Sequence, residues 1–232
     1  MTERNRAPES PHEKAGRGRG SSERAETGRC REDSRRRILM AAIREFAENG
    51  YIRASTNAIV RDAGTSKGLL FHYFKSKKDL YFAALEYAVE SMIDYFMQNL
   101  GNLPADPVDR FVRWAHLKLK ALMEQPLIYK MTVGGITEAP EDIRSEARSR
   151  LDKIAQDVMP AFMSGIDFSR LRQGVDPQKA LRYILTVFGS LSDSYLQAAL
   201  RSPDQGLSSL PQAMVEIEEY AGFLKHGLYR KE

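Results

Sequence analysis

The chain has 232 residues, of which 42% are hydrophobic, enough apolar material for two small domains or one large one. It contains no apolar run of about 18 residues, and its charged N-terminus lacks the apolar centre of a secretion signal, so we expect neither a membrane protein nor a secreted one. The single cysteine, Cys30, excludes an internal disulfide and favours a reducing cytoplasm.

The net charge of +4 is distributed unevenly along the chain. Residues 1–32 carry +2, residues 33–80 carry +5, and residues 81–232 carry −3. Because phosphates attract lysine and arginine, this distribution predicts that the segment 33–80 contacts a nucleic acid. The larger, slightly acidic remainder is expected to lie away from it.

Residues 1–32 are rich in arginine, glycine, serine and glutamate and almost lack large apolar side chains. Such a segment cannot bury enough surface to offset its ordering entropy, so we predict a disordered, arginine-rich arm. Its arginines suit either a basic arm that enters a DNA minor groove or a solvated tail, and both interpretations stay open. An intermolecular disulfide or a redox role for Cys30 is a further alternative.

The following segment predicts three helices of a small domain. A helix over residues 33–49 carries an apolar stripe from Ile38 to Ala47 and ends at Gly50. Thr56 is expected to cap a second helix that Gly64 ends, and Ser66 a third that runs to about residue 74. Two short helices joined by a glycine-containing turn form a helix-turn-helix, whose second helix enters the DNA major groove.

Candidate DNA contacts gather at the starts of these short helices. Glycine at position 68 disfavours a helix, which is easier to understand if a partner approaches the backbone. Lys77 is expected to begin the next helix, where a bound phosphate would offset its repulsion by the helix dipole. The alternative is an ordinary lysine-rich surface. The predicted DNA-binding residues are Arg53, Ser55, Thr56, Thr65, Ser66, Lys67, Gly68, Leu70, Phe71, His72, Tyr73 and Lys77.

The stretch Ile38–Leu80 resembles the N-terminal DNA-binding domain of the TetR/AcrR family of bacterial repressors. The matching residues are ILMAAIREFAENGY, Thr56 and the block AGTSKGLLFHYFKSKKDL. Two positions depart from the family pattern, which often has threonine at Leu69 and tyrosine at Phe71. Contacts made there by hydroxyl groups must therefore be apolar in this chain or come from neighbouring residues such as Tyr73.

Beyond residue 76 the sequence alternates helical segments with proline and glycine breaks. It lacks sustained period-two alternation, so we predict an all-α protein with essentially no sheet. The first segment, 77–99, is too long for one small domain and is expected to bridge two. The predicted helices span 77–99, 107–123, 126–134, 140–163, 176–200 and 211–229.

The resemblance implies that residues 33–80 bind DNA and that residues 81–232 form a larger helical domain for ligand binding and dimerisation. It places an effector site among the middle helices without assigning particular residues. Large side chains there either line that site or belong to the core, and His116 in particular suits a buried core histidine. The candidate ligand-binding residues are Phe96, Trp114, His116, Met123, Tyr129 and Met131.

The last two predicted helices carry apolar stripes, which either complete the core or meet a second copy. The resemblance implies the second role, because in this family the last two long helices pair with their copies. A twofold dimer would present two recognition helices to a palindromic site. The predicted interface residues are Leu181, Ile184, Phe188, Leu191, Tyr195, Met214, Ile217, Ala221 and Leu224.

Motifs of catalysis are missing from the sequence. The four histidines are scattered, and there is no HExxH, CxxC, P-loop or dinucleotide fingerprint, so we expect no catalytic residue, metal site or cofactor. The resemblance to the TetR/AcrR family implies a homodimeric repressor, released from a double-stranded palindromic operator by a small-molecule effector in the bacterial cytoplasm. One alternative is a DNA-binding regulator without an effector, either an activator or a constitutive repressor. The other is a helical enzyme with an appended basic domain.

Overall fold

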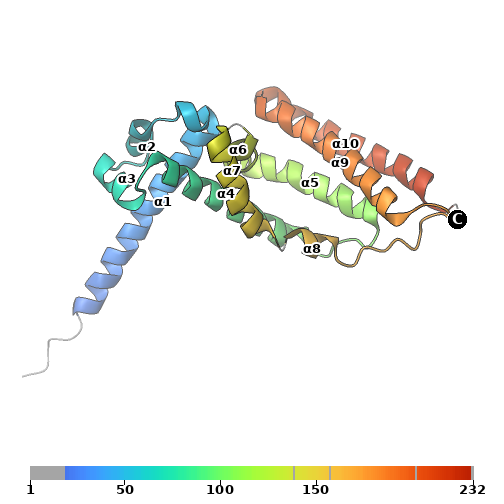
Figure 1. Cartoon of the computed structure of the whole chain (residues 1–232), viewed down its shortest axis with the longest axis horizontal. Helices are drawn as coiled ribbons and strands as arrows, with labels where there is room; N and C mark the ends of the chain where they lie inside the picture. Colours follow the sequence, from blue (N-terminus) through green and yellow to red (C-terminus); the bar gives the residue numbers. More distant parts are fainter. Residues whose placement is uncertain (1–18, 138, 157, 202, 231–232) are drawn as a thin grey trace, which may run out of the picture.

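The computed structural model describes residues 19–230 except 138, 157 and 202, and Figure 1 shows their arrangement. Within these residues the fold is all-α, as the sequence predicted, and the β-pairing is one isolated bridge between Leu171 and Tyr229. The helices are α1 (Arg19–Arg53), α2 (Thr56–Asp62), α3 (Lys67–Tyr73), α4 (Lys77–Leu100), α5 (Pro107–Glu124), α6 (Pro126–Thr137), α7 (Glu141–Ala155), α8 (Val158–Met163), α9 (Pro177–Arg201) and α10 (Pro203–Leu228).

Helix α1 begins at Arg19 instead of the expected Asp33, so residues 19–32 are helical where the sequence predicted disorder. The buried stripe that starts at Ile38 stabilises the first part of the helix that forms. Each residue then added to that helix gains one hydrogen bond, so the polar residues before Ile38 can extend it. Gly50, with a φ of 66°, interrupts the helix where the sequence placed its end. Residues 1–18, most of the predicted arm, lie outside the described residues.

Helices α1, α2 and α3 enclose a small core that includes the fully buried side chains of Ile38, Ile59 and Leu70. Helix α6 packs on both α1 and α4, so the N-terminal domain and the larger domain share one continuous hydrophobic core. The hydroxyl group of Tyr81 in α4 donates a hydrogen bond of 2.6 Å to the carbonyl of Gly135 in α6. A Cβ at Gly135 would lie 2.6 Å from Leu85 Cδ1, so glycine permits this close contact.

The larger domain is built around α5, which packs against α4, α6, α9 and α10. Helices α9 and α10 lie side by side along the far end of the molecule (Figure 1). Further helix bounds differ from the prediction. The segment 140–163 divides into α7 and α8, α6 runs to Thr137 instead of ending at 134, and the last helix begins at Pro203 with Pro211 inside it. Proline favours the first helical turn, which is why the sequence placed a helix start at residue 211.

Candidate nucleic-acid interface

Helix α3 has one face in the core and one in solvent. Leu70 is buried in this helix, and Phe74, which follows the last helical residue as its C-cap, is buried as well. Lys67, Gly68, Phe71 and His72 are exposed, which agrees with their predicted role. The prediction that Leu70 contacts DNA is wrong, because its side chain is 0% exposed and belongs to the core of α1–α3.

Serine caps fix where α3 and its neighbours begin. The Oγ of Ser66 accepts a hydrogen bond of 3.1 Å from the amide of Leu69, as predicted for this cap. Helix α2 is capped by Ser55 and not by the predicted Thr56, and the Ser55 amide itself donates to Glu45 of α1 at 2.8 Å. The bond from Ser55 to Glu45 joins the start of α2 to α1, whereas the Ser66 cap fixes the first turn of α3.

The other polar candidates lie around these helix starts. The Arg53 side chain is exposed, and its Nε donates to the carbonyl of Asn49 at 3.3 Å. Ser55 and Ser66 are exposed, whereas Thr56, Thr65 and Tyr73 are half-buried. The exposed side chains of Arg53, Ser55 and Ser66 are therefore polar groups that DNA phosphates could contact.

Three lysines near the start of α4 differ in their surroundings. Lys77 donates to the carbonyl of Ile52 at 3.1 Å and lies 5.1 Å from the centre of the Tyr51 ring, and burial lowers the pKa of its ammonium group. Lys78 forms an ion pair of 2.8 Å with Glu146 of α7. Lys75 is exposed. Lys77 therefore ties α4 to the end of α1 in this structure, a contact that the sequence did not indicate.

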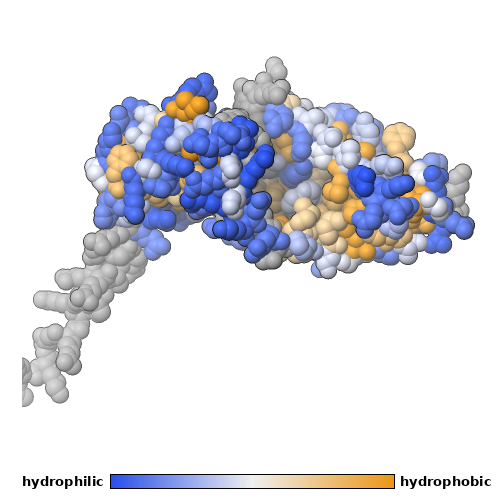
Figure 2. Space-filling model, viewed as in Figure 1, coloured by the Kyte–Doolittle hydropathy of each residue, from blue (hydrophilic) through white to orange (hydrophobic). Residues whose placement is uncertain are grey.

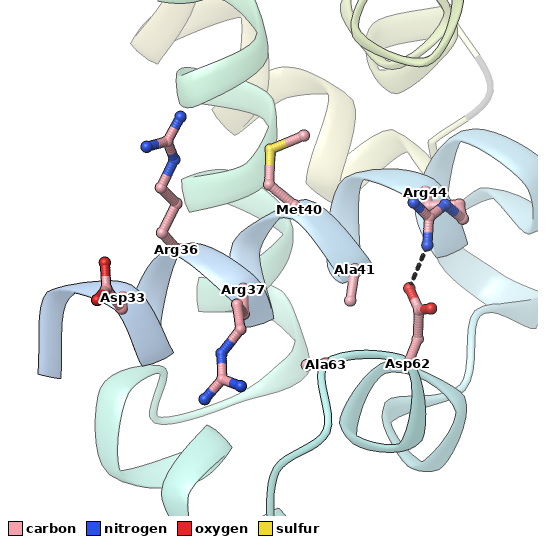
Figure 3. Close-up of a pocket in the computed structure, with 8 residues that line it drawn as sticks. All are labelled: Asp33, Arg36, Arg37, Met40, Ala41, Arg44, Asp62 and Ala63. Carbon is pink, nitrogen blue, oxygen red and sulfur yellow. Dashed lines mark hydrogen bonds and ion pairs between the residues drawn. The ribbon is translucent and has the colours of Figure 1, made fainter. Parts of the chain in front are cut away.

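A groove of about 690 Å³ lies between α1 and the end of α2, and Figure 3 shows its walls. Arg44 closes one side with an ion pair of 2.6 Å to Asp62. The side chains of Arg36 and Arg37 point in opposite directions, so the groove does not gather its positive charge around one point (Figure 3). We assign it no ligand. Its lining residues are Asp33, Arg36, Arg37, Met40, Ala41, Arg44, Asp62 and Ala63.

The six candidate ligand-binding residues lie in separate places. Phe96 and Trp114 are in contact, with ring centres 4.6 Å apart, and the ring of Phe162 from α8 is tilted by 49° against Trp114, with ring centres 5.2 Å apart. Tyr129 and Met131 are buried in the core, whereas Met123 is 51% exposed. The Nε2 atom of His116 lies 3.4 Å from the carbonyl oxygen of Met214, in a groove between α5 and α10.

The residues predicted for the dimer interface face the interior of a single chain. Ile184, Phe188, Ile217 and Ala221 are buried, because α9 and α10 use these stripes to pack on α5. The other five are half-buried against the same core, namely Leu181, Leu191, Tyr195, Met214 and Leu224. The large apolar side chains that stay exposed on these helices are Tyr183, Leu185, Val215, Tyr220 and Phe223, which the sequence analysis did not select.

No group of three or more potential metal-ligating side chains occurs among the described residues. In that part of the chain, no helix combines the length and the apolar composition that crossing a bilayer requires.

The N-terminal domain matches a known family. Residues 38–84 match the model of bacterial regulatory proteins of the tetR family. An uncharacterized HTH-type transcriptional regulator of Mycobacterium tuberculosis is 34% identical over 76 residues, which are 33% of this chain and 39% of that protein. The chain thus aligns with about two fifths of the length of that relative.

Two further relatives extend the likeness over the larger domain. The fatty acid metabolism regulator protein of Bacillus subtilis is 20% identical over 190 residues, which are 78% of this chain and 91% of that protein. A TetR transcriptional regulator from Chloroflexus aurantiacus superposes with a TM-score of 0.63 at 19% identity, covering 88% of this chain and all of that structure, a likeness of fold. Both curated relatives are named as regulatory proteins and not as enzymes. Residues 38–84, which include the helix-turn-helix of α2 and α3, thus match the tetR family of bacterial regulatory proteins, and 88% of the chain shares the fold of a TetR transcriptional regulator.

Proposed function

We propose that this protein is a DNA-binding transcriptional regulator that places α3 in the major groove of an operator. The observation that carries the proposal is the exposed face of α3, where Lys67, Gly68, Phe71 and His72 stand together on a capped helix. The segment 33–80 also carries a charge of +5, which suits a polyanionic partner. Lysine and arginine contacts to phosphate would supply affinity, and the face of α3 would supply sequence specificity.

The proposal includes a homodimer, formed through the outer face of α9 and α10. Its support is the set of exposed apolar side chains on these two helices, among which Phe223 is 76% exposed and Tyr183 is 55% exposed. Figure 2 shows hydrophobic side chains gathered on the half of the molecule that contains α5, α9 and α10, whereas the surface over α1–α3 is mainly hydrophilic. Two copies would present two α3 helices to the half-sites of a palindrome.

We further propose repression that a small apolar effector relieves. The support is an aromatic cluster of Phe96, Phe111, Trp114 and Phe162, in which ring centres lie 4.6 to 5.2 Å apart and short helix α8 supplies one ring. Movement of α8 would open this cluster to an apolar molecule. The name of the Bacillus subtilis relative makes fatty acids the first effectors to test. An activator, or a repressor without an effector, is the alternative.

Recovery of sheared genomic DNA from the source organism tests DNA binding. At about 0.15 M salt, where purely electrostatic binding is weak, we expect one or a few palindromic sites to be recovered. Lys67→Ala should lose them, and Lys179→Ala, which removes an exposed lysine from α9, should retain them. Equal recovery of all sequences by the three proteins would contradict specific regulation through α3.

A further inference from the structure

The proposed DNA-binding face of α3 includes a partly exposed aromatic side chain. Phe71 is 37% exposed, although its neighbours Leu70 and Phe74 are in the core. Figure 2 shows a hydrophobic spot over α3 within a largely hydrophilic surface. Phe71 belongs neither to the buried core nor to the residues packed against it, so part of its ring is available to an apolar group of a partner.

The neighbours of Phe71 leave the ring accessible from outside the protein. Lys67 and Gly68 precede it by four and three residues, so all three share one face of α3. Gly68 has no side chain to cover the ring, and a Cβ there would meet only Ser66 Oγ, at 3.9 Å. The face therefore consists of a cation, a bare stretch of backbone and an exposed phenyl ring.

The chemistry of DNA restricts what such a ring can contact. A phenyl group forms no strong hydrogen bond, so placing it against a phosphate would remove water without compensation. Base edges in the major groove present donors and acceptors, and the apolar group among them is the C5-methyl of thymine. A lysine on the same face would meanwhile be satisfied by a neighbouring phosphate or guanine.

We propose that Phe71 is a specificity-determining residue that packs on the C5-methyl group of a thymine in each half-site. This inference rests on the proposed DNA binding through α3, and it adds which chemical group of the DNA the helix recognises. It predicts a thymine at a fixed position of each half-site. Deoxyuridine differs from thymidine only by the absence of that methyl group. The protein should therefore bind DNA more weakly when deoxyuridine replaces thymidine at that position.

The experiment begins with a random-sequence duplex library from which the full-length protein selects its sites. The selected site is then synthesised with deoxyuridine in place of thymidine, one position at a time, and each affinity is measured at about 0.15 M salt. At one position in each half-site we expect affinity to fall about fourfold, the ratio that corresponds to ~0.8 kcal/mol for one buried methyl-sized group. The other positions should change little.

The variants assign the effect to the ring. Phe71→Ala should bind the thymidine and deoxyuridine forms of that position equally, while Met97→Ala, which truncates a 58% exposed side chain on α4, should keep the fourfold difference. Circular dichroism checks that both variants are folded. A selected site with no discrimination at any position would overturn this inference alone, as would discrimination that Phe71→Ala retains. Failure to select any site would overturn the proposed DNA binding and this inference with it.

Discussion

Gly68 occupies the second residue of α3, and the protein itself does not require glycine there. A Cβ would make one ordinary contact, so Gly68→Ala should stabilise the fold, by up to about 1 kcal/mol from helix propensity. If DNA approaches this stretch of backbone, the added methyl group should lower operator affinity. Thermal unfolding and DNA titration on the same sample measure both changes. A more stable variant with unchanged affinity would show that DNA stays away from this residue.

The sequence predicted the role of a residue correctly where that role depends on its near neighbours in the chain. The Ser66 cap was predictable, because this serine precedes a helical pattern and its Oγ accepts an amide three residues on. The choice between Ser55 and Thr56 was not, because both carry hydroxyl groups and the distant Glu45 binds the Ser55 amide. Leu70 was misassigned because two adjacent leucines leave the inward position ambiguous until α3 is placed against α2.

At the scale of the elements, charges join α7 to the start of α4, close to the DNA-binding domain. Glu146 of α7 accepts from Lys78 at 2.8 Å and from Arg150 at 2.7 Å, and Arg150 also pairs with Glu86 at 2.9 Å. The Arg150 guanidinium lies 4.3 Å from the centre of the Phe82 ring. Hydrogen bonds from Lys78 and then Arg150 hold the pKa of Glu146 below its ordinary 4.5.

This network predicts an acid-dependent loss of stability. Because the pKa of Glu146 is lowered by folding, its contribution is present above the ordinary value of 4.5 and is lost as pH falls through the lowered one. Glu146→Gln should therefore lose less stability than the wild type over that acid range, as measured by urea unfolding at a series of pH values. Asp152→Asn, an exposed change on the same helix, is the matched control. Identical pH profiles for all three proteins would contradict the role of Glu146.

Element types were more predictable than element ends and surfaces. The period of the apolar residues was enough to predict an all-α chain, because it reflects each helix alone. Helix α1 begins at Arg19 and α10 at Pro203, where the sequence has no apolar periodicity. The sequence therefore predicted both helices to begin further along the chain, at residues 33 and 211. The stripes of Ile184 and Ile217 were assigned to a partner, whereas α5 already covers them within one chain. Sequence alone cannot decide whether such a stripe packs within one chain or against a second copy, because both arrangements bury the same kind of apolar stripe.

At the scale of the whole molecule, effector binding and DNA binding should be linked. Trp114 is the only tryptophan and lies in the aromatic cluster, so its fluorescence should report an apolar effector that enters there. If a fatty acid lowers operator affinity by some factor, operator DNA must lower fatty-acid affinity by the same factor. Paired titrations, with fluorescence for the effector and anisotropy for labelled DNA, measure both. Changes in Trp114 fluorescence without any change in DNA affinity would favour regulation without this effector.

The same exposed face of α9 and α10 supports the proposed pairing of two chains. Phe223→Glu places a charge where a 76% exposed ring would be buried between copies, and burying an unpaired charge is strongly unfavourable. We expect a folded monomer by sedimentation, with helix content unchanged because this side chain lies outside the core. Its affinity for a palindromic site should fall towards that for a single half-site, since the two α3 helices are no longer joined.

Met97→Glu is the matched control for this change, because it adds the same charge at a 58% exposed apolar position on α4. It should keep the assembly state of the wild type. A dimer that survives Phe223→Glu and the additional change Tyr183→Glu would place the contact between copies elsewhere. A wild-type protein that is monomeric at micromolar concentration but dimeric on DNA would instead mean that the operator itself supplies part of the free energy that pairs the two copies.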